Sequence, residues 1–149
     1  TCFTVTNEAQ NILFEALDKL DVNLTGIILK PNMVTSGSSC EKQASAEEIA
    51  ELTIKCLAKN IPKEVPGIAF LSGGQSDENA SNNLSHINKI NSNPWKLTFS
   101  YGRALQLEAM KKWGGDNNQN SEAQKIILKR AHFNSLAASG KYNLEMENN

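Results

Sequence analysis

The chain has 149 residues, with 15 basic and 16 acidic side chains and a formal net charge of −1. This length favours one domain with a sizeable core, and the balanced charge argues against a surface for nucleic acid or for a membrane. No run approaches the roughly 20 apolar residues of a membrane-spanning helix. The N-terminal TCFT has neither a methionine nor a basic segment, so we expect no secretory signal.

The cysteine content indicates a reducing environment. The chain contains Cys2, Cys40 and Cys56, an odd number with no C-x-x-C pair. This pattern favours reduced thiols over a disulfide framework or a metal site. We therefore expect a cytoplasmic protein that holds no metal.

The first predicted element is a helix over residues 7–20, whose apolar residues recur at helical spacing. We expect its buried face to consist of Ile12, Leu13, Ala16, Leu17 and Leu20. The segment GIILK, residues 26–30, then predicts a short buried strand. Its regular pairing should end at Pro31, because proline lacks the N–H that a further ladder bond needs.

A second strand and two helices are predicted in the middle of the chain. Ser45 begins an S-x-x-E capping box at the start of a helix over residues 46–60. The apolar GIAFL, residues 67–71, predicts the second strand. The sequence SGG then leads into a helix over residues 76–90.

The last third of the chain predicts one more strand and two more helices. The segment KLTFSY, residues 96–101, alternates apolar and polar residues and predicts the third strand. Helices over 104–113 and 121–139 follow, and a glycine pair ends the first of them. We place one domain over residues 1–143 and a disordered tail over residues 144–149.

Strands that alternate with helices imply a parallel sheet with right-handed crossovers. The apolar strands further suggest burial on both faces of that sheet. Three strands are fewer than the eight of a (β/α)8 barrel, which needs on the order of 250 residues, and they leave two unpaired edges. We therefore predict an α/β fold that is the C-terminal part of a (β/α)8 TIM barrel: three parallel strands with flanking helices plus a C-terminal helix.

Polar, basic or glycine residues follow the C-terminal end of each of the three predicted strands. The C-terminal ends of parallel strands share one rim, where the active sites of such folds lie. We therefore expect the residues at these ends to converge, namely Lys30, Ser72, Gly73, Ser100, Gly102 and Arg103.

The two glycine-containing loops at this rim suit a phosphate group. The SGG loop can turn backbone N–H groups outward without a Cβ in the way. The following GR pair adds a helix N-terminus and a guanidinium. A glycine pair after a strand is more often a simple turn, so the hypothesis depends on both loops lying beside a lysine.

Lys30 ends an otherwise apolar strand, and two interpretations of it are open. The side chain can extend to water at the rim or pair with a carboxylate. Alternatively, a desolvated amine beside other cations attacks a carbonyl carbon and forms a Schiff base. A phosphorylated ketone would bring such a carbonyl together with the phosphate.

Several segments resemble the class I fructose-bisphosphate aldolases: GIILKPNMVTSG, VPGIAFLSGGQSDENASNNLSHIN, PWKLTFSYGRALQLEAMKKWGG and NSLAASGKY. The resemblance covers nearly the whole chain up to about residue 143. It implies a (β/α)8 barrel, usually a homotetramer, that uses no metal or other cofactor. It also implies the reversible cleavage of fructose 1,6-bisphosphate to dihydroxyacetone phosphate and glyceraldehyde 3-phosphate in glycolysis and gluconeogenesis.

The resemblance makes Lys30 the Schiff-base lysine. It assigns one substrate phosphate to Ser72, Gly73, Ser100, Gly102 and Arg103. The implied ligands are sugar bisphosphates and triose phosphates, with actin or adhesin tails as partners by analogy, and with no nucleic acid or membrane. The family's further active-site acids, lysines and arginine belong to segments that this sequence does not contain.

Two hypotheses about function stay open at this point. The chain is either the C-terminal part of a working aldolase, or a catalytically incompetent fragment that acts as a phosphate-binding or scaffolding module. The second hypothesis rests on the missing acid and base groups, since proton transfer typically contributes roughly 10²–10⁴-fold to a rate. Another Schiff-base lyase of the barrel class fits SGGQS and FSYGRAL less closely.

Overall fold

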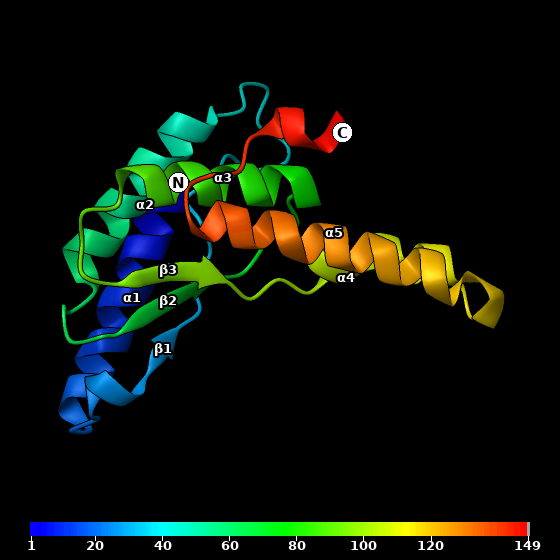
Figure 1. Cartoon of the computed structure of the whole chain (residues 1–149). Helices are drawn as coiled ribbons and strands as arrows, with labels where there is room; N and C mark the ends of the chain where they lie inside the picture. Colours follow the sequence, from blue (N-terminus) through cyan, green and yellow to red (C-terminus); the bar gives the residue numbers. More distant parts are fainter. Residues whose placement is uncertain (149) are drawn as a thin grey trace.

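The computed structural model describes residues 1–148. Its helices and strands alternate along the chain as the sequence predicts (Figure 1). In order they are α1 (Cys2–Lys19), η1 (Leu24–Gly26), β1 (Ile28–Leu29), α2 (Ala46–Asn60), β2 (Gly67–Phe70), α3 (Asp77–Ile90), β3 (Lys96–Phe99), α4 (Arg103–Trp113), η2 (Asn117–Gln119), α5 (Asn120–Ala138) and η3 (Leu144–Asn148), where η marks a 3₁₀ helix.

The strands form a three-stranded sheet in the order β1-β2-β3, and both pairings are parallel. One face of this sheet is covered, because Ile68 and its neighbour Leu97 lie in the core. The alternate residues Lys96 and Thr98 are exposed, and Ile28 on the edge strand is 61% exposed. Burial on both faces is therefore wrong for this chain. In a barrel, side chains of the other strands would fill the space against the second face.

Helix α1 begins earlier than predicted and buries a different face. It starts at Cys2, and its buried residues are Thr6, Gln10 and Phe14. Of the predicted apolar stripe only Leu17 packs against the core, whereas most of the stripe is exposed, with Ile12 59% exposed. The other exposed large apolar residues of this segment are Val5, Leu13 and Leu20. Periodicity identifies an apolar stripe but cannot say which neighbour covers it.

The buried Thr6 and Gln10 of α1 have hydrogen-bond partners on other segments, although within residues 1–148 the Gln10 Nε2 is buried without one. The Thr6 hydroxyl accepts a hydrogen bond of 2.9 Å from the Asn32 side-chain amide. The Gln10 carbonyl oxygen accepts one of 3.6 Å from the Cys56 thiol on α2. These contacts fix α1 against α2 and against the loop that follows β1.

The ends of α2 and α4 follow the local signals in the sequence. The Glu48 N–H donates to the Ser45 hydroxyl at 3.2 Å, and the Ser45 N–H donates to the Glu48 carboxylate at 2.9 Å. The predicted capping box is thus confirmed. At the end of α4, Gly114 adopts a left-handed conformation, with φ of 54°.

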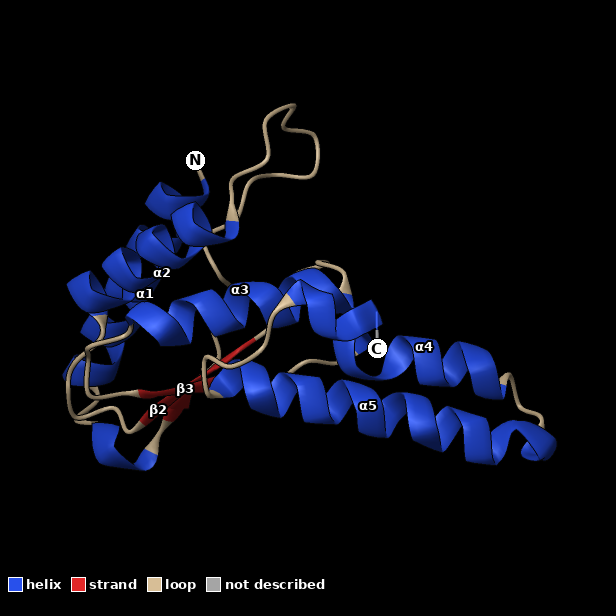
Figure 2. Ribbon diagram, turned by 45° about the horizontal axis from the view of Figure 1, so that its top comes forward, coloured by secondary structure: helices blue, strands red, loops and turns tan. Residues whose placement is uncertain are grey.

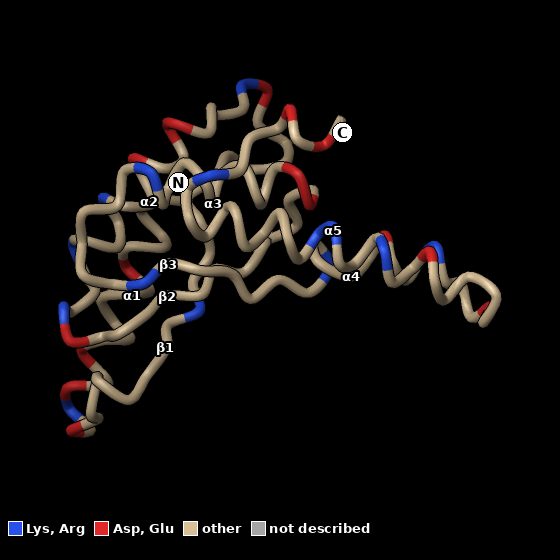
Figure 3. The backbone as a smooth tube through the Cα atoms, viewed as in Figure 1, with Lys and Arg blue, Asp and Glu red and all other residues tan. Residues whose placement is uncertain are grey.

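Helices α4 and α5 form a hairpin that extends beyond the sheet (Figures 1 and 2). Basic and acidic residues both occur along this hairpin (Figure 3). Two of them form an exposed pair, in which the Lys125 ammonium lies 2.7 Å from the Glu122 carboxylate. The hairpin thus carries charges of both signs on its outer surface.

The C-terminal segment is ordered in the structure, in contrast to the disordered tail predicted over residues 144–149. Leu144–Asn148 form η3, and Asn149 lies outside the described residues. Tyr142 is fully buried, and its carbonyl oxygen accepts a hydrogen bond of 2.8 Å from the Ser85 hydroxyl on α3. The proposed division at residue 143 therefore falls within a segment that packs on α3 and α5.

A buried cation holds this C-terminal segment. Arg130 on α5 is 6% exposed and pairs with the Glu147 carboxylate, and its second partner is Asp77 at 3.4 Å. Burial disfavours the charged guanidinium, but its hydrogen bonds to Glu147 and Tyr142 and the charges of Glu147 and Asp77 raise the pKa of Arg130. This cluster connects η3, α5 and the first residue of α3.

We predict that Glu147→Gln lowers the free energy of unfolding by about 2–3 kcal/mol. This is less than the roughly 3–5 kcal/mol for a fully broken buried pair, because Asp77 remains beside Arg130. Urea denaturation measures the loss. The control is Glu122→Gln, which removes the exposed pair with Lys125 and should leave stability unchanged. Equal effects of the two substitutions would show that the C-terminal cluster does not stabilise the fold.

Candidate functional site

The C-terminal ends of the strands lie side by side at one edge of the sheet, as the sequence predicts. The Leu71 N–H donates to the Pro31 carbonyl at 3.0 Å, and the Ser100 N–H donates to the Phe70 carbonyl at 2.8 Å. These hydrogen bonds continue the parallel ladder beyond the strands and hold each loop beside the next. Three of the predicted site residues lie at these ends, namely Lys30, Ser72 and Ser100.

Lys30 follows β1, the edge strand, and is exposed. By alternation its side chain lies on the same face as Ile28, the uncovered face of the sheet. Within residues 1–148 no carboxylate forms an ion pair with it. The apolar enclosure expected around this amine is not supplied by the chain, because both the free edge of β1 and the open face adjoin it.

The segment after Lys30 is nevertheless held firmly in place. The Asn32 side-chain amide donates to the Thr6 hydroxyl at 2.9 Å, and the Val34 N–H donates to the Thr53 hydroxyl at 2.9 Å. Val34 is 4% exposed. Sequence reasoning missed these supports, although a polar residue at a core position of a helix, such as Thr53, is the signal that could have found them.

The SGG loop has the backbone shape that an anion site needs. Gly73 and Gly74 both have positive φ, of 60° and 85°. The Gln75 N–H donates to the Ser72 carbonyl at 3.1 Å and closes the turn. Within the described chain, the N–H groups of Gly73 and Gly74 donate to no protein acceptor. Successive free N–H groups of this kind form a concavity for anions.

The start of α4 presents a second set of free N–H groups. Gly102 precedes the helix and offers no side-chain cap. Its carbonyl accepts from the N–H groups of Leu105 and Gln106, at 3.1 and 3.0 Å. The N–H groups of Arg103 and Ala104 therefore remain available at the positive end of the helix dipole.

The two loops meet at a hollow of about 360 Å³ that Gly74 and Arg103 both line. Of the predicted site residues Arg103 lines this hollow, whereas Lys30, Ser72, Gly73, Ser100 and Gly102 are not among its lining residues. Arg103 is exposed, and within residues 1–148 it forms no ion pair.

Two carboxylates also line this hollow, but each already has a cationic partner. Asp77 pairs with Arg130 at 3.4 Å, and Glu108 pairs with Lys111 at 2.7 Å. Arg103 is thus the cation at this place without a counter-ion among the described residues. An incoming anion would supply one.

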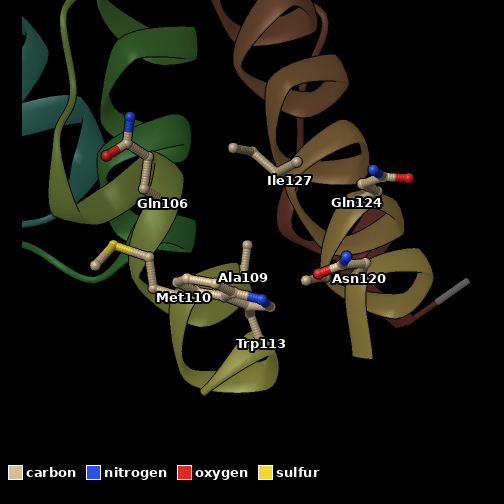
Figure 4. Close-up of a pocket in the computed structure, with 8 residues that line it drawn as sticks. Gln106, Ala109, Met110, Trp113, Asn120, Gln124 and Ile127 are labelled. Atoms are coloured by element: carbon tan, nitrogen blue, oxygen red, sulfur yellow. The ribbon is translucent and has the colours of Figure 1, made fainter. Parts of the chain in front are cut away.

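A separate groove of about 280 Å³ lies between α4 and α5 (Figure 4). Trp113 and Met110 from α4 face Ile127 from α5 across it, and the side-chain amides of Asn120 and Gln124 lie at its edge. None of the residues that line it is titratable. The groove therefore suits apolar contact and offers no group for acid, base or nucleophilic chemistry.

Residues 1–148 lack the features of two other kinds of site. They hold no cluster of three or more His, Cys, Asp or Glu side chains placed to bind a metal ion. They also contain no helix with the length and hydropathy that crossing a membrane requires.

Comparison with known families places the whole chain in one of them. The family model described as glycolytic fructose-bisphosphate aldolase class-I matches residues 1–149. A probable class 1 fructose-bisphosphate aldolase from Xanthomonas axonopodis pv. citri is 49% identical over 143 residues, which is 95% of this chain and 43% of that protein. Fructose-bisphosphate aldolase 1 from Toxoplasma gondii is 48% identical over 95% of this chain and 39% of its own length.

A solved structure agrees with this placement. Fructose-bisphosphate aldolase from Plasmodium falciparum, in a ternary complex with TRAP and a small-molecule inhibitor, has a TM-score of 0.92 and 44% identity. The match covers 95% of this chain and 41% of that one. The chain thus spans about two fifths of the length of the relatives that it matches. The predicted barrel part is confirmed, and the chain belongs to the class I fructose-bisphosphate aldolase family.

Proposed function

We propose that this chain supplies the Schiff-base lysine and one phosphate site of a class I fructose-bisphosphate aldolase. The protein would cleave fructose 1,6-bisphosphate reversibly to dihydroxyacetone phosphate and glyceraldehyde 3-phosphate, in glycolysis and gluconeogenesis. The observation that carries this proposal is the single rim that holds Lys30, two loops with free N–H groups, and Arg103 without a counter-ion.

The chemistry follows from the amine and from its place at the rim. The neutral Lys30 amine attacks the ketone carbon, water leaves, and a protonated imine forms. This cation accepts the electron pair of the C3–C4 bond, one bond removed from the imine carbon, as the C4 hydroxyl loses its proton to a base. The C3–C4 bond breaks, the aldehyde leaves, and an enamine remains on Lys30. The proton transfers need acids and bases, which we assign to the portion of the relatives that this chain does not span.

The phosphate would sit where charge and free donors coincide. We assign the phosphate to the N–H groups of Gly73 and Arg103, which donate to no acceptor within residues 1–148, and the Arg103 guanidinium would neutralise the anion. Ser100 and the buried Ser72 contribute hydroxyl groups at the same rim. Gly102 leaves the start of α4 open, so that a phosphate oxygen can approach the backbone closely.

A catalytically incompetent phosphate-binding or scaffolding module is the second candidate function. One observation favours it, namely the exposed position of Lys30 on the open face of a partial barrel. The described residues do not supply the apolar enclosure that activates a Schiff-base lysine. The five residues that we assign to the phosphate, in contrast, all lie within residues 1–148.

Partners and location are part of the same proposal. We propose a cytoplasmic homotetramer whose ligands are sugar bisphosphates and triose phosphates. The unpaired state of Cys2, Cys40 and Cys56 supports the reducing compartment. The complex of the Plasmodium falciparum relative with TRAP supports an adhesin tail as a further partner, and actin rests on the family resemblance.

Covalent trapping with dihydroxyacetone phosphate and borohydride tests the proposed function. A reduced adduct on Lys30 in a natural protein well above 16.3 kDa, the mass of this chain, supports a whole aldolase. An adduct on the 149-residue chain itself would mean that the partial barrel keeps both nucleophile and phosphate site. No adduct in either protein would contradict the lyase proposal and favour the phosphate-binding module.

We expect Lys30→Met to abolish this covalent trapping, because within residues 1–148 Lys30 is the one lysine that directly follows a strand. Intact mass and peptide mapping measure the adduct. The matched control is Lys96→Met, which removes an exposed lysine from the same sheet face but from the opposite end of β3. An adduct that persists in Lys30→Met but disappears in Lys96→Met would contradict the assignment.

We expect Arg103→Ala to weaken binding of dihydroxyacetone phosphate roughly 10- to 100-fold, as for the loss of a hydrogen bond to a charged group. Titration calorimetry gives the affinity, and thermal melting should change little because Arg103 is exposed. Lys112→Ala, at the other end of α4, serves as the control for general loss of positive charge. Unchanged affinity in Arg103→Ala would refute its role in phosphate binding.

A further inference from the structure

Gln75 directly follows the two glycines of the SGG loop. Its side chain contacts both the SGG loop and the loop that follows Lys30. Its Nε2 donates to the Ser72 carbonyl at 2.9 Å, in addition to the backbone bond from its own N–H. The same Nε2 lies 3.7 Å from the sulfur of Met33, to which it donates a weak hydrogen bond. Met33 stands three residues after Lys30 in the sequence.

A second amide fixes the orientation of Gln75. The Asn83 Nδ2 on α3 donates to the Gln75 Oε1 at 2.7 Å. Because this contact occupies the oxygen of Gln75, its NH₂ group must face Ser72 and Met33. Asn83 is 6% exposed, so the bond is shielded from water. The amide pair thus ties α3, the SGG loop and the Lys30 loop together.

The SGG loop needs such support because its own backbone supplies little. Gly73 and Gly74 have no side chains to pack and adopt positive φ. One backbone hydrogen bond closes the turn, and the Gln75 side chain adds a second to the same Ser72 carbonyl. Without this second bond the free N–H groups of the turn would sample more directions.

The proposed substrate makes the spacing between the two loops critical. A phosphorylated ketone has a fixed covalent path from its carbonyl carbon to its phosphorus. The amine and the anion site must therefore be held at one separation, since an error of about 1 Å can cost on the order of 100-fold in rate. Met33 is 2% exposed, so the point where Gln75 touches the Lys30 loop is itself fixed.

We infer that Gln75 is a positioning residue, which sets the distance between the Lys30 amine and the phosphate-binding SGG loop through Met33, Ser72 and Asn83. This inference rests on the proposed function. Gln75 acts through the two loops and forms no bond to substrate. Its loss should therefore affect a ketone that carries a phosphate far more than the same ketone without one.

The test compares two ketones in the natural protein that carries this chain. We expect Gln75→Met, which keeps the side-chain length but removes its hydrogen bonds, to lower the rate of trapping by dihydroxyacetone phosphate on the order of tenfold. Trapping of unphosphorylated dihydroxyacetone should fall less than about twofold, because only the amine is needed there. A change in the ratio of the two rates is the signature of positioning.

Gln43→Met is the matched control. The Gln43 Nε2 also donates to two backbone carbonyls, those of Gly37 and Cys40, at 3.0 and 2.8 Å, but in an exposed loop. Its substitution should leave the ratio unchanged. Equal losses for both ketones in Gln75→Met, or no loss for either, would overturn the inference.

Asn83→Asp provides a second variant that leaves Gln75 itself intact. A carboxylate oxygen in place of the amide donor would repel the Gln75 Oε1 and turn the amide, so that Nε2 no longer faces Ser72. We expect the same shift in the ratio, and an unchanged ratio in this folded variant would also overturn the inference. Failure of the wild-type protein to trap either ketone on Lys30 would instead contradict the proposed function.

Discussion

The parallel register of three short strands is the constraint on which the candidate site depends. Each strand has only two to four residues, so the sheet could not by itself align loops over a long distance. Two hydrogen bonds beyond the strand ends extend the alignment, from Leu71 to Pro31 and from Ser100 to Phe70. They bring the three loops side by side before any side chain is considered. The amine and the phosphate loops share a rim because the backbone ladder continues into those loops.

The two faces of this sheet explain why some parts of the candidate site are enclosed and Lys30 is not. Its covered face packs Ile68 and Leu97 into the core, whereas the opposite face carries Ile28 and Lys30 into the open. A closed barrel of eight strands fills its interior with side chains. This chain has three strands, and it spans about two fifths of the length of its relatives. Both fractions agree with a part of such a barrel. The SGG loop and the start of α4 lie entirely within this chain, whereas the enclosure of Lys30 would need the remaining strands.

Local sequence signals predicted the elements well where caps and glycines define them. Ser45 and Gly114 fixed the start of α2 and the end of α4, and the three strands lie where apolar runs precede Pro31, SGG and SYG. The face of α1 could not be predicted in this way. Its buried Thr6 and Gln10 depend on partners distant in the sequence, and most of its apolar stripe is exposed.

The same difference, between local signals and contacts with distant partners, separates the residues of the candidate site. Residues that act through backbone shape or through their place at a strand end, such as Gly73 and Lys30, could be found from the sequence. Residues that act by supporting them, such as Thr53 and Gln75, could not, because each reaches a partner outside its own element. The structure of residues 144–148 was missed for the same reason. The polar sequence of this segment does not reveal that Glu147 pairs with the buried Arg130 on α5.

These supporting contacts converge on the start of α3. On one side, Asn83 and Gln75 hold the SGG loop to the body of that helix. On the other side, Asp77, the first residue of α3, is bound by Arg130, which also binds Glu147 of the C-terminal segment. The side-chain amides of Gln75 and Asn83 therefore hold the SGG loop. The ion pairs of Arg130 hold the start of α3, the helix that follows this loop. Asp77 lies three residues after Gly74, so Arg130 joins the C-terminal segment to the start of the helix that follows the SGG loop, whereas Lys30 forms no ion pair within residues 1–148.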